Sequence, residues 1–298
     1  FGTGVNFNGT SQSDFMGASF DVNAGKVLVT YKNASNSNYG TASVGTVSGT
    51  SISFGTATVF DSVSTAKTSC CYDSTSQKSD NYEYIVCVYD PDQNKTVVVV
   101  TSNTNSNTNC YVGTVSGTSI SFGSGVTLQS FPATGLSATY DTTANKIVFC
   151  YQKASSCGAK VGTVSGTSIS FGTETEFNSS FSYYISASYM PSTNTTVVAF
   201  VDNSNSEIAT YIIGTVSGTG ISFGSKVTYN TNNNQSITTV SAPDFNAVMM
   251  TSRTFSSPYP LVANVYSAAS NLTATNLLGI TSAAIADTET GTINTWGS

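Results

Sequence analysis

The chain has 298 residues, 39% of them hydrophobic and only 9% charged, so a packed core is expected and a disordered chain is excluded. Its formal net charge is −6 and its 10 Lys and Arg residues are scattered, which argues against nucleic acid as a partner, because nucleic acid binding needs a basic face. No apolar run approaches the ~18 residues of a membrane span, so no membrane insertion is expected.

The first predicted strand, residues 1–7, matches the later segment 54–60, so the chain begins inside a repeat. Residues 16–32 contain two β-rich runs separated by a turn of Asp, Asn and Gly, which predicts two strands. Residues 136–153 and 184–201 follow the same plan. These segments are expected to form the first two strands of each repeat.

The third and fourth strands of each repeat are predicted from the sequence VGTVSGTSISFG. It occurs at 44–55, 112–123 and 161–172, and as IGTVSGTGISFG at 213–224. A Gly-Thr pair between two alternating runs is typical of a hairpin with a two-residue turn. In this register one face is apolar, the other carries Ser and Thr, and each phenylalanine covers a facing glycine. The predicted pairs are Gly45/Phe54, Gly113/Phe122, Gly162/Phe171 and Gly214/Phe223.

A period of roughly 50 residues with only strand-like segments indicates propeller blades of four strands. We therefore predict an all-β fold, a β-propeller of about five four-stranded blades over residues 1–276. Residues 1–7 would supply the fourth strand of the last blade, because closure removes open sheet edges. The alternatives are six blades or an open repeat array. Residues 277–298 leave the repeat and are expected to form a C-terminal extension or the start of a further segment.

The repeat is interrupted by an insertion around 61–82 and by the loss of the hairpin motif from residue 268 onwards. Loops that break a repeat often carry binding, although a neutral insertion is an equally good interpretation. Tyrosines at loop tips could stack on sugars, while most tyrosines of the chain are better explained by packing. The candidate ligand contacts at loop tips are Tyr39, Tyr82 and Tyr259.

The six cysteines fit no zinc pattern, and the chain has no histidine to complete one. A two-residue turn at 153–154 would place Cys150 and Cys157 opposite each other, which predicts a disulfide between them. The alternative is that both thiols stay reduced and buried. The spacing assigns no partner to Cys70, Cys71, Cys87 or Cys110.

No residue pattern points to catalysis. The absence of histidine removes triads and the commonest general base. A propeller glycosidase would need two or three central carboxylates, but four aspartates follow an aromatic residue at one repeat position, where a turn residue is expected. The four are Asp21, Asp73, Asp90 and Asp141. We therefore expect no enzyme, and no catalytic, cofactor-binding or metal-binding residues.

The VGTVSGTSISFG repeats resemble propeller-like repeats in tail-fibre and appendage proteins of marine bacteriophages. The segment 277–297 is similar to one that recurs towards the C-terminal part of such fibre proteins, so the resemblance covers most of the chain. It implies a virion surface role in attachment to a host cell and brings no catalytic motif. The expected partners are a host receptor or glycan, other virion proteins and further copies of the chain.

We therefore predict an extracellular, virion-surface fibre or appendage protein. It would act as a structural scaffold and as a module that attaches to the host surface, most simply through a glycan. One alternative is a secreted bacterial lectin or adhesin. A less favoured alternative is a propeller glycoside hydrolase.

Overall fold

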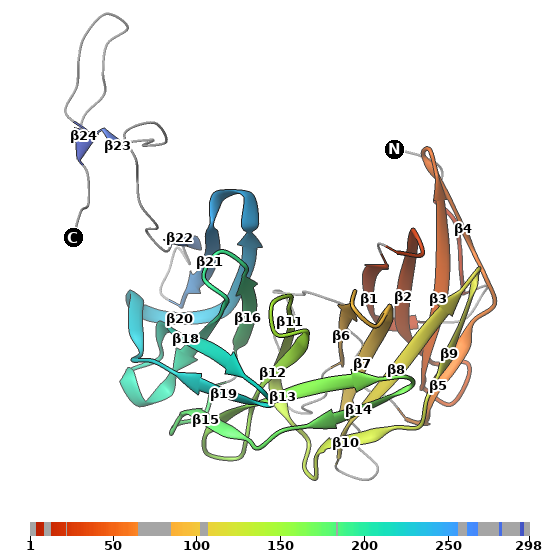
Figure 1. Cartoon of the computed structure of the whole chain (residues 1–298), viewed down its shortest axis with the longest axis horizontal. Helices are drawn as coiled ribbons and strands as arrows, with labels where there is room; N and C mark the ends of the chain where they lie inside the picture. Colours follow the sequence, from red (N-terminus) through yellow and green to blue (C-terminus); the bar gives the residue numbers. More distant parts are fainter. Residues whose placement is uncertain are drawn as a thin grey trace, which may run out of the picture.

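The computed structural model is all-β, as predicted. The described residues contain two short 3-10 turns, η1 (Asn203–Asn205) and η2 (Pro243–Phe245), and no α-helix. No helix in this part of the chain is long and apolar enough to cross a membrane. The sheets are antiparallel and follow one another along an arc that is open at the top of Figure 1. The structure describes residues 4–8, 13–21, 23–64, 85–101, 107–182, 184–255, 261–267, 280–281 and 293–294.

The arc consists of similar units, which we call blades. In blades 1 to 3, three strands pair in chain order, and the third strand also pairs with two shorter strands that follow it. Blade 1 contains β1 (Ser13–Asp21), β2 (Lys26–Asn33), β3 (Tyr39–Ser48), β4 (Ser51–Phe54) and β5 (Thr58–Ser64). Blade 2 contains β6 (Ile85–Asp90), β7 (Lys95–Thr101), β8 (Thr108–Ser116), β9 (Ser119–Phe122) and β10 (Val126–Gln129). Blade 3 contains β11 (Thr134–Asp141), β12 (Lys146–Gln152), β13 (Cys157–Ser165), β14 (Ser168–Phe171) and β15 (Thr175–Asn178).

Blades 4 and 5 are joined because one long strand, β20 (Val227–Ala242), belongs to both. Its N-terminal half pairs with β18 and its C-terminal half with β21, which gives one seven-stranded sheet. Blade 4 also contains β16 (Ile185–Met190), β17 (Thr195–Asp202), β18 (Ile208–Ser217) and β19 (Gly220–Phe223), and blade 5 contains β21 (Ala247–Thr254) and β22 (Leu261–Ser267). The short strands β23 (Ile280–Thr281) and β24 (Ile293–Asn294) pair with each other.

The predicted hairpin register is confirmed in all four copies. Gly45 lies opposite Phe54, and the other three copies have the equivalent pair. The turn glycine has a positive φ, 60° at Gly49, which glycine adopts without steric cost. The phenylalanine covers the facing glycine, since a Cβ added to Gly113 would lie 2.9 Å from the ring of Phe122. The motif is therefore a structural hairpin.

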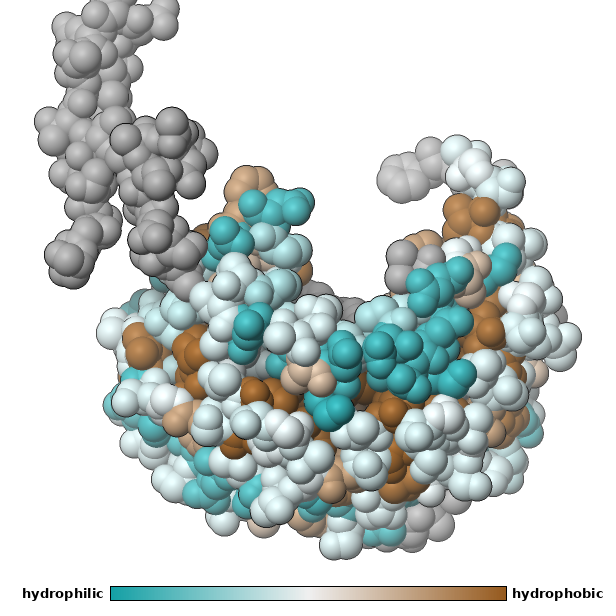
Figure 2. All heavy atoms as spheres, viewed as in Figure 1, coloured by the Kyte–Doolittle hydropathy of each residue, from teal (hydrophilic) through white to brown (hydrophobic). Residues whose placement is uncertain are grey.

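Apolar side chains fill the space between neighbouring blades. In β12, Phe149 belongs to the cluster shared with blade 2, and Val148 belongs to the cluster shared with blade 4. A strand that is buried on both faces reads as a continuous apolar run, which explains the Val-rich second strands. Figure 2 shows apolar residues between polar ones along the outer part of the arc.

Hydroxyl groups link the first strands of neighbouring blades. Ser137 Oγ of β11 accepts a hydrogen bond from the N–H of Ala187 in β16 at 3.0 Å. Ser186 Oγ of β16 accepts one from the N–H of Thr239 in β20 at 3.0 Å. These bonds satisfy backbone donors at sheet edges that would otherwise be unpaired.

The two ends of the arc differ from its middle. Near the N-terminus, the ring of Phe7 packs on Phe54 and Tyr31, with centroid distances of 4.9 and 5.3 Å. The ring of Phe60 in β5 packs on Phe122 of the next blade in the same way, with a centroid distance of 5.3 Å. At the other end, β22 pairs only with β21 among the described strands. The described residues form an open arc and do not show the predicted closed ring of five blades.

The predicted cysteine pair is not in register. Cys150 lies opposite Ala159, and Cys157 lies opposite Gln152. The loop between β12 and β13 is longer than the two residues expected, so the prediction that the cysteines face each other is wrong. Both are buried and free, and burial raises the pKa of the Cys157 thiol to about 12.

Several predictions concern positions outside the described residues. The insertion was expected at 61–82; β5 runs to Ser64, and 65–84 lie outside the described residues. Most of the C-terminal segment 277–298 lies outside as well. The same holds for Cys70, Cys71, Asp73, Tyr82 and Tyr259.

Candidate binding groove between neighbouring blades

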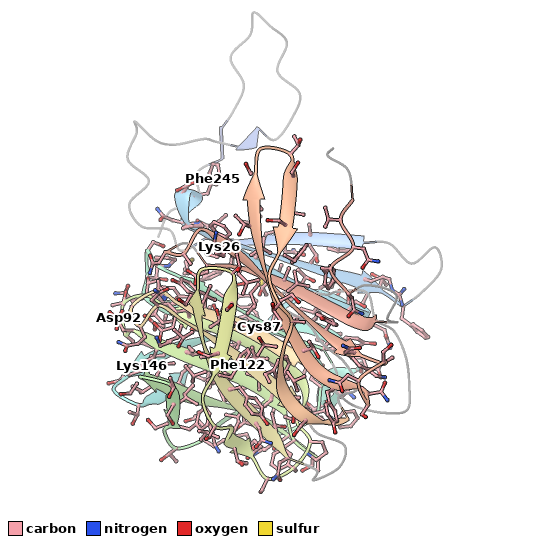
Figure 3. The ribbon with its side chains drawn as sticks, turned by 90° about the vertical axis from the view of Figure 1, so that its right-hand side faces the viewer. Lys26, Cys87, Asp92, Phe122, Lys146 and Phe245 are labelled. Atoms are coloured by element: carbon pink, nitrogen blue, oxygen red, sulfur yellow. The ribbon has the colours of Figure 1, made fainter. Side chains whose placement is uncertain are left out.

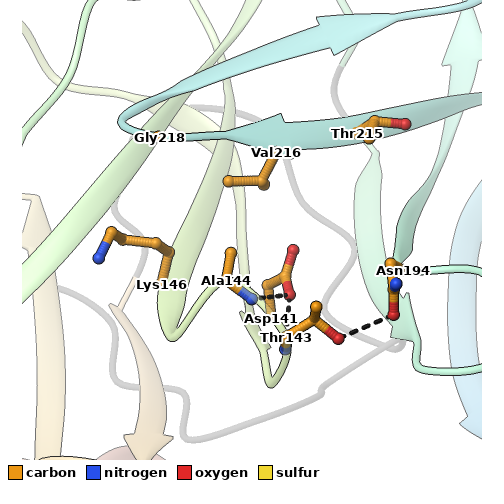
Figure 4. A pocket seen from close by; sticks show the side chains of 8 residues that line it. All are labelled: Asp141, Thr143, Ala144, Lys146, Asn194, Thr215, Val216 and Gly218. Atoms are coloured by element: carbon orange, nitrogen blue, oxygen red, sulfur yellow. Dashed lines mark hydrogen bonds between the residues drawn. The ribbon is translucent and has the colours of Figure 1, made fainter.

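A groove with a volume of ≈490 Å³ lies between blades 3 and 4 (Figure 4). This volume is within the ~300–1,000 Å³ usual for small-molecule sites. The groove lies at the end of the blades where the first strand turns into the second and where the hairpins have their tips; we call this end the turn rim. Its lining residues are Asp141, Thr143, Ala144, Lys146, Asn194, Thr215, Val216 and Gly218.

The floor of the groove is the turn between β11 and β12. Asp141 is 2% exposed, and its Oδ1 accepts hydrogen bonds from the N–H groups of Thr143 and Ala144 at 2.9 and 2.8 Å. Short carboxylate side chains stabilise turns in this way. The same cap forms in blade 1, where Asp21 Oδ1 accepts from the N–H of Ala24 at 2.8 Å. The predicted turn role is therefore confirmed at these two aspartates.

Blade 4 supplies one wall through Asn194, which the buried Tyr189 supports from behind through Thr143. The Tyr189 hydroxyl donates to Thr143 Oγ1 at 2.7 Å, and Thr143 Oγ1 donates to Asn194 Oδ1 at 2.8 Å. Asn194 has a φ of 54°, a left-handed conformation that Asn tolerates better than most residues. This chain of hydrogen bonds joins the turns of the two blades and holds polar groups at the groove.

The other wall is the hairpin tip of blade 4. Thr215 and Gly218 are exposed and Val216 is half-buried, so the wall combines a hydroxyl with an apolar patch. The tip is fixed on blade 3 by close packing: a Cβ added to Gly172 would lie 1.8 Å from the carbonyl oxygen of Thr219. The groove is thus built from three segments that are far apart in the sequence.

The groove has the chemistry of a site for a hydroxyl-rich ligand. Asp141 and Lys146 contribute one negative and one positive charge, and Thr143, Thr215 and Asn194 contribute uncharged donors and acceptors. Such groups bind hydroxyls in either direction. Among the described residues, no three His, Cys, Asp or Glu side chains are grouped so as to hold a metal ion.

The tyrosines expected at loop tips are not those that reach the groove. Tyr39 is half-buried and opens β3 beside Asn33, at the end of blade 1 opposite the turn rim. Tyr189, which contacts the lining residue Thr143, was missed because it lies on a strand. The available signal was that Tyr89 and Tyr140, the repeat equivalents of Tyr189, directly precede the turn aspartates of their blades.

A second polar cluster lies between blades 2 and 3, at the end opposite the turn rim. Glu174 Oε2 accepts from the Tyr151 hydroxyl at 2.7 Å and also from Gln129, and Glu174 Oε1 accepts from Lys153 Nζ at 2.7 Å. Burial raises the pKa of Glu174, but the hydrogen bonds from Lys153 and Tyr151 outweigh it and hold that pKa below its usual value. Tyr151 is 0% exposed, so its hydroxyl stabilises the blade interface and faces no ligand.

This cluster predicts a specific loss of stability in acid. The folded pKa of Glu174 is lowered from 4.5, so its stabilisation is complete above that pH and is lost as the pH falls through the folded pKa. Glu174→Gln is expected to lower the free energy of unfolding by about 1–2 kcal/mol at pH 7, after a discount for partial exposure, and by much less at pH 3. Urea unfolding at both pH values measures this. Glu176→Gln is the control, because Glu176 is 49% exposed and 3.6 Å from Lys153; an equal loss in both variants would contradict the assignment.

Comparison with known proteins is informative about the fold. No protein-family model matches the chain, and no curated protein matches its sequence. A Dyadobacter fermentans protein of unknown function aligns with a TM-score of 0.56 and 10% identity, over 86% of this chain and 79% of that chain. A triple mutant of AofleA from Arthrobotrys oligospora aligns with a TM-score of 0.51 and 10% identity, over 86% and 69%.

A mutant of the NanB sialidase from Streptococcus pneumoniae aligns with a TM-score of 0.48 and 11% identity, over 84% of this chain and 40% of that chain. This likeness is too distant to bear on function. At such low identities the first two structures show the fold alone. The chain is therefore an all-β repeat protein with a propeller-like fold.

Proposed function

We propose that the chain is a virion-surface fibre or appendage module that attaches to a host-cell glycan through the groove between blades. The observation that carries the attachment role is the groove itself, in which a carboxylate, an ammonium, an amide and hydroxyls surround a small apolar patch. The resemblance of the repeats to marine phage fibre proteins supports the virion setting. A secreted bacterial lectin or adhesin would use the same groove and differs in where the protein is found.

The proposal is tested by binding and by localisation. The purified protein is applied to a glycan array, and antibodies against it are used in immunogold microscopy of virions from a phage that encodes the chain. Binding to defined glycans with gold at the fibres is the expected result. Binding without virion labelling would favour the lectin or adhesin. Release of free sugar from a bound glycan would favour the glycoside hydrolase, and no binding to any glycan would overturn the attachment role.

We also propose that the arc closes into a ring of five blades. Blade 5 exposes three apolar residues that are register partners across its strands, Val240, Met249 and Val265, at 49%, 39% and 66%. The equivalent of Met249 in blade 4 is Val197, which is 0% exposed because blade 5 covers it. In the described part of the chain, no neighbour covers the outward face of blade 5, whereas every earlier blade has one.

Among the residues that the structure describes, no blade covers the opposite face of blade 1. Ile52 is half-buried, whereas its repeat equivalents Ile120, Ile169 and Ile221 are 4–5% exposed. Phe7 already has the place on blade 1 that an outer strand of a preceding blade would have. Pairing of residues 4–8 with the free edge of β22 would complete blade 5 and bury both faces.

Ring closure predicts a specific cross-link. In blade 4, Tyr211 of the third strand lies opposite Val227 of the outer strand, and the repeat alignment makes Ala263 and Val5 their equivalents. Val5→Cys with Ala263→Cys is expected to form an intramolecular disulfide under mild oxidation, detected by peptide mass spectrometry. Val5→Cys with Ser267→Cys is the mismatched control. Cross-linking at the control level, or only between two chains, would contradict closure within one chain.

A further inference from the structure

We propose that the groove occurs three times, at the junctions of blades 1 and 2, 2 and 3, and 3 and 4, and that each copy binds one neutral sugar residue of a repetitive glycan. This inference rests on the proposed function, because it names the ligand class and the number of sites of the same groove. It makes the chain a trivalent binder, in which each site is weak and the array is strong.

The first observation is that three turns have the same construction. Each starts with a buried aspartate whose Oδ1 accepts a backbone N–H of the turn, as Asp90 does from Gln93 at 3.0 Å. Each ends with a lysine that begins the next strand, so every groove floor pairs an aspartate with a lysine, and the middle floor carries a second carboxylate, Asp92. The turns are 21–26, 90–95 and 141–146.

The second observation is that the following blade presents the same tyrosine and asparagine at each junction. The Tyr89 hydroxyl donates to Asn94 Oδ1 at 2.9 Å, and the Tyr140 hydroxyl lies 3.4 Å from Asn145 Oδ1. The asparagines are left-handed at all three junctions, with φ values of 51°, 53° and 54° at Asn94, Asn145 and Asn194.

The third observation is that the tyrosine reaches back to the turn of the preceding blade. Burial and a hydrogen bond with Asp21 raise the pKa of Tyr89 to about 12, and burial and a hydrogen bond with Asp90 raise the pKa of Tyr140. At the junction of blades 3 and 4 the same hydroxyl position contacts Thr143. Every junction therefore has its polar groups held by contacts between the two blades.

The hairpin walls are equivalent too. A Cβ added to Gly55 would lie 1.8 Å from the carbonyl oxygen of Thr118, and one added to Gly123 would lie 1.9 Å from that of Thr167. Gly172 makes the equivalent contact at the third junction. The three sites all lie at the turn rim, and Figure 3 shows Lys26, Asp92 and Lys146 one below another in its left half. One repetitive ligand surface could therefore meet all three grooves.

The pattern ends at the junction of blades 4 and 5. Met190 replaces the turn aspartate, Ser241 replaces the tyrosine, and residues 268–279, where a hairpin would follow, lie outside the described residues. The grooves also differ among themselves, since Asp92 and Gln93 stand where the third groove has Thr143 and Ala144. The middle groove is therefore more polar, and its preference among sugars should differ.

A neutral sugar fits these grooves better than a charged ligand. The turn aspartate and the lysine balance each other in the first and third floors, and Asp92 adds one negative charge to the middle floor. Amide, hydroxyl and carboxylate groups match the mixed donors and acceptors of sugar hydroxyls. The half-buried Ala144 and Val216 offer an apolar surface to the C–H face of a ring. Linked weak sites gain avidity of about 10²–10⁴ when one ligand can span them.

The test blocks each groove in turn with a bulky side chain. Ala24→Trp, Gln93→Trp and Ala144→Trp place a bulky ring in each turn and keep the backbone N–H that the aspartate caps. Ala154→Trp is the matched control, an exposed alanine in the same blade as Ala144 but at the opposite end. Binding is measured by biolayer interferometry on surfaces densely coated with glucose, galactose, mannose or N-acetylglucosamine, with thermal melts as a check of folding.

Wild type is expected to bind at least one surface, and each single groove variant is expected to bind about tenfold more weakly. The triple variant should not bind, and the control should bind like wild type. Loss in the Ala144 variant alone would overturn the threefold repetition. Full binding by the triple variant would overturn the groove as the site and leave the attachment role intact, whereas no binding by wild type would overturn the attachment role itself. If a variant fails to fold, native mass spectrometry of wild type with the methyl glycoside decides: three ligands per chain support the inference, and one or none contradicts it.

Discussion

Gly123→Ala is expected to destabilise the protein by about 3 kcal/mol or more, because overpacking of a rigid contact costs ~1–3 kcal/mol and a backbone atom cannot move aside as a side chain can. Gly123 follows the hairpin of blade 2, and its added Cβ would lie 1.9 Å from the carbonyl oxygen of Thr167 in the hairpin turn of blade 3. The two blades would have to separate at this point. Urea unfolding, followed by circular dichroism, measures the loss.

The chain contains its own control for this prediction. Gly224 has the same place in the motif, but the structure describes no following hairpin, and its added Cβ would meet only the Ile213 carbonyl oxygen at 3.9 Å. Gly224→Ala should therefore be neutral or stabilise by a few tenths of a kcal/mol, because alanine restricts the unfolded chain. Equal losses in the two variants would show that the glycine acts within its own blade.

Gly123 and the hairpin before it show how much of the fold can be predicted from the sequence. The hairpin register follows from alternation and from a Gly-Thr turn, both of which are local, and the structure confirms it at Gly45 and Phe54. The glycine that follows the phenylalanine, Gly123 in blade 2, is equally regular in the sequence. A larger residue is excluded there because a carbonyl group of the next blade lies against it. Local pattern therefore predicts the blade, whereas contacts between blades appear only in three dimensions.

The candidate site lay beyond sequence reasoning for the same reason. Asp141, Asn194 and Val216 belong to three separate segments of two blades and are brought together by the packing of blade against blade. The role of Asp141 as a turn residue could be predicted, since its repeat position directly precedes a turn. The cysteine prediction failed on a local detail, because a longer loop than expected shifts Cys157 to a position opposite Gln152.

Phe177→Ala is expected to cost about 3–4 kcal/mol, the usual loss when a large buried aromatic side chain is removed. Phe177 is 6% exposed, and its ring centroid lies 5.4 Å from those of both Phe200 and Phe223. It fills the junction of blades 3 and 4, so its loss leaves a cavity between two β-sheets that cannot collapse freely. Urea unfolding measures the change, and Phe245→Ala, at a site that is 77% exposed, is the control.

The junction of blades 2 and 3 shows how this loss can be repaired. There the equivalent of Phe177 is Leu128, and the missing volume is filled by Phe149, whose ring packs on Phe171 at 5.6 Å. Blade 4 has Val198 at the position of Phe149, beside Gly214, the repeat equivalent of the Gly162 that contacts the Phe149 ring.

Phe177→Leu and Val198→Phe should each destabilise the protein by about 1–2 kcal/mol alone, through a cavity and through overpacking. Their combination should recover most of that loss, because it reproduces the packing of the neighbouring junction. A double-mutant cycle measures the coupling between the two positions. Additive losses would show that the junctions are not interchangeable and that the blades pack as individually adapted pairs.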